Sequence, residues 1–199
     1  MSLSQLLSNP QASIGEIGAY LDALDAPSRW ADLDTLSGKQ LRLLFERAAS
    51  APPITRDFFV PAGVGAGVEV IHDGKNSLPL FRRFQKRFCR PQDGSPRLFG
   101  YNEGSTRPWI GPGYFVAHDS DGQGWSERGA VVVDYWLTPD GPVVEGWPEV
   151  VSASRGLQFF VYHHTRDFMR PVSKHVSIGA AYKNEMAMGA YFVLCRQDP

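Results

Sequence analysis

Hydrophobic side chains recur at helical spacing in two stretches near the start of the chain. In residues 10–24 an apolar side chain stands at every third or fourth position, directly after an Asn–Pro pair that suits a helix start. The second stretch begins at Ser37, which has Gln40 at the spacing of a capping box, and it ends before Pro52. The pattern predicts two amphipathic helices.

The apolar faces of these helices, which include Leu41 and Leu44, need a partner that covers them. One partner is the sheet predicted from the rest of the chain. The other is the same face of a second copy, which would make the protein a homodimer. We expect residues 1–55 to form a helical segment that packs on a domain of residues 56–199, and we keep the homodimer as the alternative.

From residue 58 onward the chain consists of aromatic and β-branched runs that are separated by Gly, Pro, Asp and Asn. Short connections favour pairing of sequential strands, so we expect an antiparallel meander of seven or eight strands curled into a barrel or half-barrel. This mainly β (α+β), lipocalin-like architecture normally encloses a pocket. The predicted strands cover residues 67–72, 97–103, 113–119, 129–138, 156–164, 173–182 and 189–196.

Residues 76–91 depart from the strand pattern. Their apolar residues recur at steps of three and four, while Arg82, Arg83, Lys86 and Arg87 occupy the other side. The spacing predicts a basic amphipathic helix that packs on the barrel. Its positive charges would either bind an anion or form a solvated surface.

Charge and composition exclude several classes of partner. The chain has 20 basic and 21 acidic residues, so its overall charge gives no reason to expect nucleic acid as a partner. No apolar run reaches the roughly 18 residues of a membrane span, and the N-terminus lacks the pattern of a signal peptide. We expect a cytoplasmic protein whose two cysteines, Cys89 and Cys195, are thiols.

The segment 98–119 has the residue types that orient a small polar or aromatic ligand. Tyr101 and Glu103 would share one face of a strand, and Arg107 and Trp109 follow in a glycine-rich turn. Arg107 would then bind a ligand carboxylate. The alternative is a structural hairpin in which Arg107 pairs with Glu103 and Trp109 covers one end of the barrel.

Two further candidates lie in the predicted strand 129–138. Alternation places Tyr135 on the face of Val131 and Val133, and Asp134 on the opposite face. A carboxylate among large apolar neighbours needs a partner or acquires a raised pKa, and both occur in sites of proton chemistry. If this face is solvated, Asp134 has no such role.

The adjacent pair His163 and His164 is the most conspicuous polar feature of the chain. In a regular strand the two side chains point to opposite faces, so they cannot share one metal ion, and we expect neither a metal nor a cofactor. His163 could still face the interior as a general base or a hydrogen-bond donor. The alternative is a histidine that supports the following turn.

These observations predict a barrel that binds a small, partly apolar organic ligand, with a carboxylate as one recognisable group. One alternative is a cofactor-free lyase, isomerase or hydrolase that uses a His/Asp acid–base pair in the same cavity, with His163 or Asp134 as base and Arg107 stabilising an anion. The other is a structural or interaction protein with a filled barrel that forms a homodimer. The residues expected to line the pocket are Tyr101, Glu103, Arg107, Trp109, Asp134, Tyr135 and His163.

Overall fold

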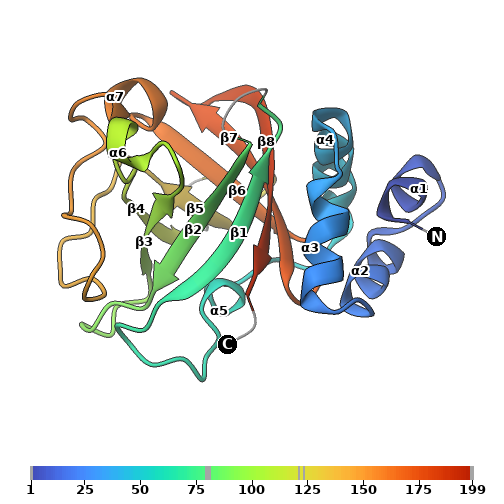
Figure 1. The fold of residues 1–199 in the computed structure, drawn as a ribbon, viewed down its shortest axis with the longest axis horizontal. Coiled ribbons are helices and arrows are strands. Elements are labelled where there is room, and N and C mark those ends of the chain that lie inside the picture. The colour runs from blue at the N-terminus through green and yellow to red at the C-terminus, as the bar shows by residue number, and fades with distance from the viewer. Residues whose placement is uncertain (1, 79–81, 121, 123, 198–199) are drawn as a thin grey trace.

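The computed structural model describes residues 2–78, 82–120, 122 and 124–197, and in this part of the chain eight antiparallel strands form a closed barrel (Figure 1). Each strand pairs with the next, and β8 closes the ring by pairing with β1. The predicted antiparallel meander is confirmed. The strands are β1 (Val70–Asn76), β2 (Arg83–Cys89), β3 (Leu98–Glu103), β4 (Phe115–Asp119), β5 (Val131–Asp134), β6 (Thr165–Pro171), β7 (Val176–Lys183) and β8 (Met186–Arg196).

Helices precede the barrel, and two short ones interrupt it. Ser37 caps α4 with Gln40 in a capping box, as predicted, and the helix expected in residues 10–24 is present as α2. The helices before the barrel are α1 (Leu3–Ser8), α2 (Ile14–Asp22), α3 (Ala26–Asp34), α4 (Gly38–Arg47), the 3-10 helix η1 (Ala48–Ser50) and α5 (Arg56–Phe59). Between strands lie α6 (Arg107–Ile110) and α7 (Gln158–Val161).

The N-terminal helices cover the outer face of β7 and β8 (Figure 1). Leu41 and Leu44 are fully buried in one hydrophobic cluster with Ile178 and Val193 from these strands. The apolar stripe therefore packs on the sheet of its own chain. These two leucines are therefore not exposed to a second copy of the chain, which was the alternative partner.

The end of the barrel beside α5 is filled with aromatic side chains. Phe59 from α5 packs on Phe88, with ring centroids 5.1 Å apart, and both contact His72. Nε2 of His72 lies 2.9 Å from the carbonyl oxygen of Phe59, and burial lowers the pKa of this histidine to about 3, so it is neutral. This half of the interior is a packed core.

The basic helix predicted for residues 76–91 is wrong, because this segment contains β2; residues 79–81 lie outside the described part of the chain. Strand alternation sends Phe84, Lys86 and Phe88 into the barrel. The sequence pattern disfavoured a strand because Arg82 would share a face with Phe84. Lys86 also lies on the inward face of Phe84. It is tolerated because it forms a buried ion pair with Asp167 on β6.

The strand predicted for residues 156–164 is also wrong. The segment instead forms α7 and a turn that ends at His164, which has a positive φ of 58°. The side-chain oxygen of Gln158 accepts a hydrogen bond of 2.8 Å from the amide of Gly113, and this bond holds α7 against the loop that follows α6. The observed strand β6 begins directly after the turn. The other six predicted strands each overlap an observed one.

Two further expectations concern membrane spans and the state of the cysteines. In the described part of the chain, no helix combines the length and the apolar character needed to cross a membrane. Cys89 and Cys195 are both buried, and no disulfide joins them.

The packing of α4 on the barrel predicts a large stability effect for one substitution. Leu44→Ala removes a fully buried side chain and should lower the free energy of unfolding by about 2–5 kcal/mol. Arg42→Ala, on the exposed side of the same helix, should change it by less than ~0.5 kcal/mol. Urea denaturation measures both, and equal effects for the two variants would contradict the observed packing.

Candidate functional site

A cavity of about 320 Å³ lies inside the barrel beside α6 and α7, both of which contribute lining residues. Figure 1 shows these two helices at the end of the barrel opposite α5. The walls of the cavity are mainly apolar and aromatic, and polar side chains gather at its base and rim. The apolar lining includes Leu78, Phe84, Ile110, Val161, Met188 and Phe192. The polar lining includes Asn76, Arg83, Lys86, Asn102, Glu103, Thr106, Arg107, Tyr135, Tyr162, Thr165 and Asp167.

A buried polar cluster lies at the base of this cavity. Nζ of Lys86 is 3.0 Å from Oδ2 of Asp167 and 3.0 Å from Oδ1 of Asn102, and it also donates to the hydroxyl of Tyr135. Nδ2 of Asn102 donates to the Tyr135 hydroxyl over 3.0 Å and to the carbonyl oxygen of Gly113 over 3.0 Å. Three strands and the residue that follows a fourth thus contribute to one network, which we call the Lys86 cluster: Lys86 (β2), Asn102 (β3), Tyr135 (after β5) and Asp167 (β6).

Burial controls the ionisation of the Lys86 cluster. Lys86 is 2% exposed and Asp167 5%. Loss of hydration lowers the pKa of Lys86, although the Asp167 carboxylate opposes this shift. Loss of hydration likewise raises the pKa of Asp167, against the effect of Lys86. The charged pair and its neutral form, amine and carboxylic acid, are therefore closer in free energy than they would be in water.

Aromatic rings surround the amine. Nζ of Lys86 lies 4.9 Å from the ring centroid of Tyr135, 5.0 Å from that of Phe115, 5.2 Å from that of Phe192 and 5.8 Å from that of Phe84. The faces of such rings attract a cation. They compensate part of the hydration that Lys86 loses, and they leave its surroundings largely apolar.

Tyr162 covers the Lys86 cluster from the side of α7. Its ring stacks on that of Tyr135, with centroids 5.1 Å apart and planes 18° apart. On its other side it lies against Gly113, where a Cβ atom would be 2.5 Å from the ring and where φ is 53°. Glycine is required at this position by both the contact and the backbone. Burial raises the pKa of Tyr162 to about 12, so its hydroxyl remains protonated.

Two arginines line the rim, each in an ion pair. Nε of Arg107 is 2.8 Å from Oε1 of Glu103, and Nε of Arg83 is 3.0 Å from Oδ1 of Asp34. Burial opposes ionisation of Glu103, but its bonds with Arg107 and with the amide of Gly104 outweigh burial and lower its pKa. The pairing of Arg107 with Glu103, which the structural alternative predicted, is present, and both residues also line the cavity.

Of the residues predicted to line a pocket, Glu103, Arg107 and Tyr135 do so, and Tyr101 and Trp109 do not. Tyr101 alternates with Asn102 and points out of the barrel, where its ring lies 4.9 Å from Trp147. Trp109 is 80% exposed on α6. The strand alternation that the sequence shows in this segment thus brings Asn102, which was not a candidate, into the cavity.

Asp134 is buried on the outer side of the barrel and does not line the cavity. Its Oδ2 is 2.8 Å from Nε of Arg166 and 3.6 Å from Nε2 of His118, and its Oδ1 accepts a bond from the amide of Trp136. Burial opposes ionisation, but bonding to His118 and Arg166 lowers the pKa of Asp134 overall. The predicted need for a partner is met by these contacts.

His163 also lies outside the cavity, in a stack of rings on the surface. Its ring is 4.6 Å from that of Phe159 and 3.8 Å from that of His164, which in turn stacks on Trp136 at 3.8 Å. His163 and Asp134 therefore do not form an acid–base pair in this cavity. In the described residues, no group of three potential ligand side chains is placed to hold a metal ion.

Sequence reasoning did not select Lys86, Asn102, Tyr162 or Asp167. Lys86 was assigned to the polar side of a helix, and Asp167 lies beyond the end of the predicted strand 156–164. The usable signal was the alternation of Phe84, Lys86 and Phe88, which places a lysine between two aromatic residues on one face of a strand.

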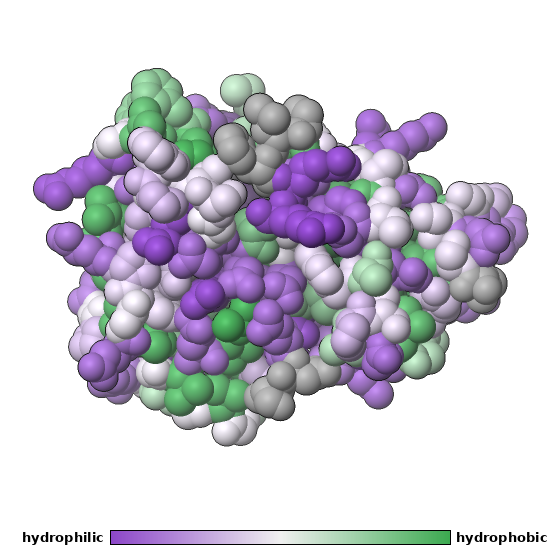
Figure 2. Space-filling view, viewed as in Figure 1, coloured by the Kyte–Doolittle hydropathy of each residue, from purple (hydrophilic) through white to green (hydrophobic). Residues whose placement is uncertain are grey.

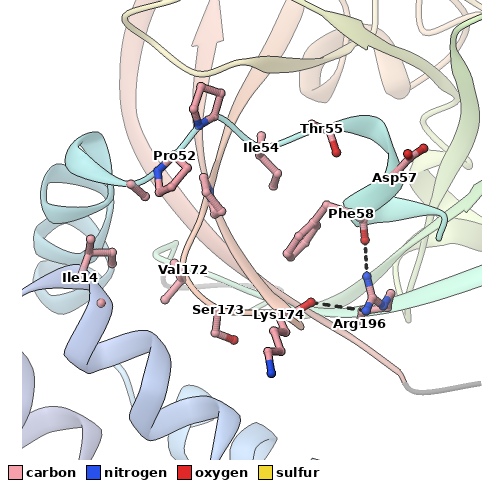
Figure 3. Close-up of a pocket in the computed structure, with 14 residues that line it drawn as sticks. Ile14, Pro52, Ile54, Thr55, Asp57, Phe58, Val172, Ser173, Lys174 and Arg196 are labelled. Carbon is pink, nitrogen blue, oxygen red and sulfur yellow. Dashed lines mark hydrogen bonds between the residues drawn. The ribbon is translucent and has the colours of Figure 1, made fainter. Parts of the chain in front are cut away.

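A second depression, of about 540 Å³, lies between the helical layer and the barrel (Figure 3). Ile14 and Pro52 form one side, and Phe58 and Val172 contribute apolar surface. Arg196 at its edge donates to the carbonyl oxygens of Phe58 and Lys174. The depression is larger than the barrel cavity, but its charged groups lie at its edge and none resembles the Lys86 cluster. The barrel cavity is therefore the candidate site.

The buried ion pair predicts that the stability effects of substituting Lys86 and Asp167 are not additive, which a double-mutant cycle measures. Lys86→Met leaves a buried carboxylate without its cation and should lower the free energy of unfolding by about 3–5 kcal/mol. Adding Asp167→Leu should recover most of this loss, because Asn102 and Tyr135 still bond to each other. The exposed Arg83→Met change should cost about 1 kcal/mol or less. Chemical denaturation of wild type, Lys86→Met, Asp167→Leu, the double variant and Arg83→Met measures these energies. Additive losses of Lys86→Met and Asp167→Leu in the double variant would contradict the ion pair.

His118 predicts a pH dependence. Its interaction with the Asp134 carboxylate raises the pKa of His118 above the ordinary 6.5. The stabilisation is thus complete below the ordinary pKa and is lost as the pH rises through the raised value. The free energy of unfolding of wild type should be higher than that of His118→Gln, and this difference should be larger at about pH 5.5 than at about pH 8.5. A difference that does not change with pH would refute the interaction.

Comparisons of the chain with family models, curated proteins and solved structures found no match. The cavity and the Lys86 cluster are therefore the observations that bear on the function of the protein.

Proposed function

We propose that the protein binds a small, partly apolar organic ligand in the open half of the barrel. The observation that carries this proposal is a cavity of about 320 Å³ with apolar walls and a few convergent polar groups, next to a core that is filled. Sites for small molecules have this combination, and their volumes begin at about 300 Å³. The ligand's apolar part would contact Phe84, Ile110 and Phe192.

The rim gives the ligand its orientation. Arg83, Lys86 and Arg107 line the cavity, against two carboxylates, Glu103 and Asp167, so basic groups are in slight excess. Among the contacts of the described residues, Arg107 uses its Nε for Glu103, and its other guanidinium donors are then available to a ligand carboxylate. A carboxylate is better accommodated at this rim than at the base, where Asp167 would repel it.

The two alternatives from the sequence have less support. An enzyme that uses His163 and Asp134 would need both at the cavity, and neither lines it. A filled barrel that dimerises through Leu41 and Leu44 would need a packed interior and a free stripe, whereas half of the interior is open and both leucines are buried.

The proposal predicts that filling the cavity abolishes binding. Ala190 on β8 lines the cavity, and Ala187 on the same strand is exposed outside it. Ala190→Phe should abolish the fluorescence increase of anilinonaphthalene sulfonate and its displacement by decanoic acid, because the new ring occupies the ligand's space. Ala187→Phe should preserve both signals.

Arg107→Ala should weaken decanoic acid but not decanol, with Arg42→Ala as the control for lost surface charge. Competition titrations at one salt concentration compare the two ligands. If neither compound binds wild type, or if Ala190→Phe binds them as well as Ala187→Phe does, the proposed function fails.

A further inference from the structure

We infer that Lys86 forms an imine with an aldehyde or ketone that enters the open half of the barrel, an inference that rests on the ligand-binding function proposed above. Lys86 is the one lysine among the described residues that line the cavity. Its Nζ lies at the base, where the inner end of a bound ligand arrives. The cavity thus offers a primary amine to a carbonyl carbon in largely apolar surroundings.

The hydrogen bonds of Lys86 permit this change. The ammonium group donates to Asp167, Asn102 and Tyr135, and a protonated imine keeps one N–H. The bond to Asp167 satisfies that N–H. Asn102 and Tyr135, which lose the lysine as donor, are already bonded to each other over 3.0 Å. No buried polar group of the cluster is therefore left without a partner when the imine forms.

Asp167 supplies the proton transfers. It first takes a proton from the Lys86 ammonium, over the 3.0 Å between Oδ2 and Nζ, and so produces a neutral amine. The amine attacks the carbonyl carbon, and an N–H proton moves to the carbonyl oxygen to give a carbinolamine. The protonated Asp167 then returns its proton to the departing hydroxyl, which leaves as water. The products are a protonated imine, the Asp167 carboxylate and one water molecule.

The reaction conserves the charge of the buried site. The ammonium and the protonated imine each carry one positive charge, and Asp167 is the counter-ion of both. The rings of Tyr135, Phe115, Phe192 and Phe84, which lie around Nζ, attract either cation. Burial lowers the pKa of Lys86, so the neutral amine needed for attack is more accessible than it is in a surface lysine. The site is preorganised for the product as well as the reactant.

Cinnamaldehyde with sodium cyanoborohydride tests the inference. The reagent reduces an imine to a stable secondary amine, and mass spectrometry of peptides locates it. We expect the adduct on Lys86, ahead of the exposed lysines. Lys86→Arg retains a cation beside Asp167 but lacks a primary amine, and it should lose this adduct. Lys183→Arg, which removes a lysine near α7, should retain it.

The counter-ion has its own signature. A protonated imine of cinnamaldehyde absorbs at longer wavelength than the free aldehyde. Asp167→Asn removes the counter-ion, so the long-wavelength band should disappear at a lower pH than in wild type. A band with the same pH midpoint in both proteins would exclude Asp167 as the counter-ion. Adducts distributed over the lysines by exposure alone, or unchanged in Lys86→Arg, would overturn the inference.

Cinnamyl alcohol separates this inference from the proposed function, because it has the same apolar part and cannot form an imine. If the alcohol displaces anilinonaphthalene sulfonate and the aldehyde leaves no adduct on Lys86 of the wild-type protein, the binding function stands and the imine is refuted. If neither compound displaces the probe and Lys86 is unmodified, both proposals fail. Peptide mapping of wild type gives this result independently of whether any variant folds.

Discussion

The ion pair between Lys86 and Asp167 connects β2 and β6 across the interior of the barrel, and the rest of the site depends on it. Two charges removed from water are costly, and mutual attraction offsets that cost only when the remaining donors and acceptors are also bonded. Asn102 and Tyr135 provide those bonds. The cluster thus combines residues of β2, β3 and β6 with Tyr135, which follows β5, and it lies at the base of the cavity.

The two ends of the barrel differ in how completely side chains fill them. At one end α5 inserts Phe59 among the interior rings, and the core is continuous. At the other end α6 and α7 lie against the rim, and apolar side chains of α7 remain on the surface, visible as green at the upper left of Figure 2. Phe160, for example, is 73% exposed. Val161 of α7 lines the cavity, and the interior below α6 and α7 stays open.

Sequence patterns predicted the elements whose side chains follow local rules. The sequence correctly predicted the strand formed by the valines of β5 and the capped, amphipathic helix α4. The apolar side chains of these elements are buried without any distant polar partner. Lys86 could not be read in this way. Its position on an inward face makes sense only with Asp167, which is far along the chain, and without that partner a helix with a basic side was the better interpretation. The wrong element and the missed site thus have one cause.

For Asp134 and His163, the conspicuous residue types were interpreted as a site, but strand direction and the turn at His164 place them outside the barrel.

The polar groups of the Lys86 cluster already bond to one another, and this limits the binding free energy that a ligand can obtain from them. An anion that approaches Lys86 meets the Asp167 carboxylate 3.0 Å away from the same nitrogen, so attraction and repulsion nearly cancel. A neutral carbonyl group avoids this repulsion and can exchange bonds with Tyr135 and Asn102, which already bond to each other. The rim has the opposite character, since Arg83 and Arg107 are partly exposed and pair with carboxylates through bonds that solvent weakens. The barrel is accordingly divided by depth: anionic groups are favoured at the mouth, apolar groups along the walls, and an uncharged, reactive carbonyl at the base.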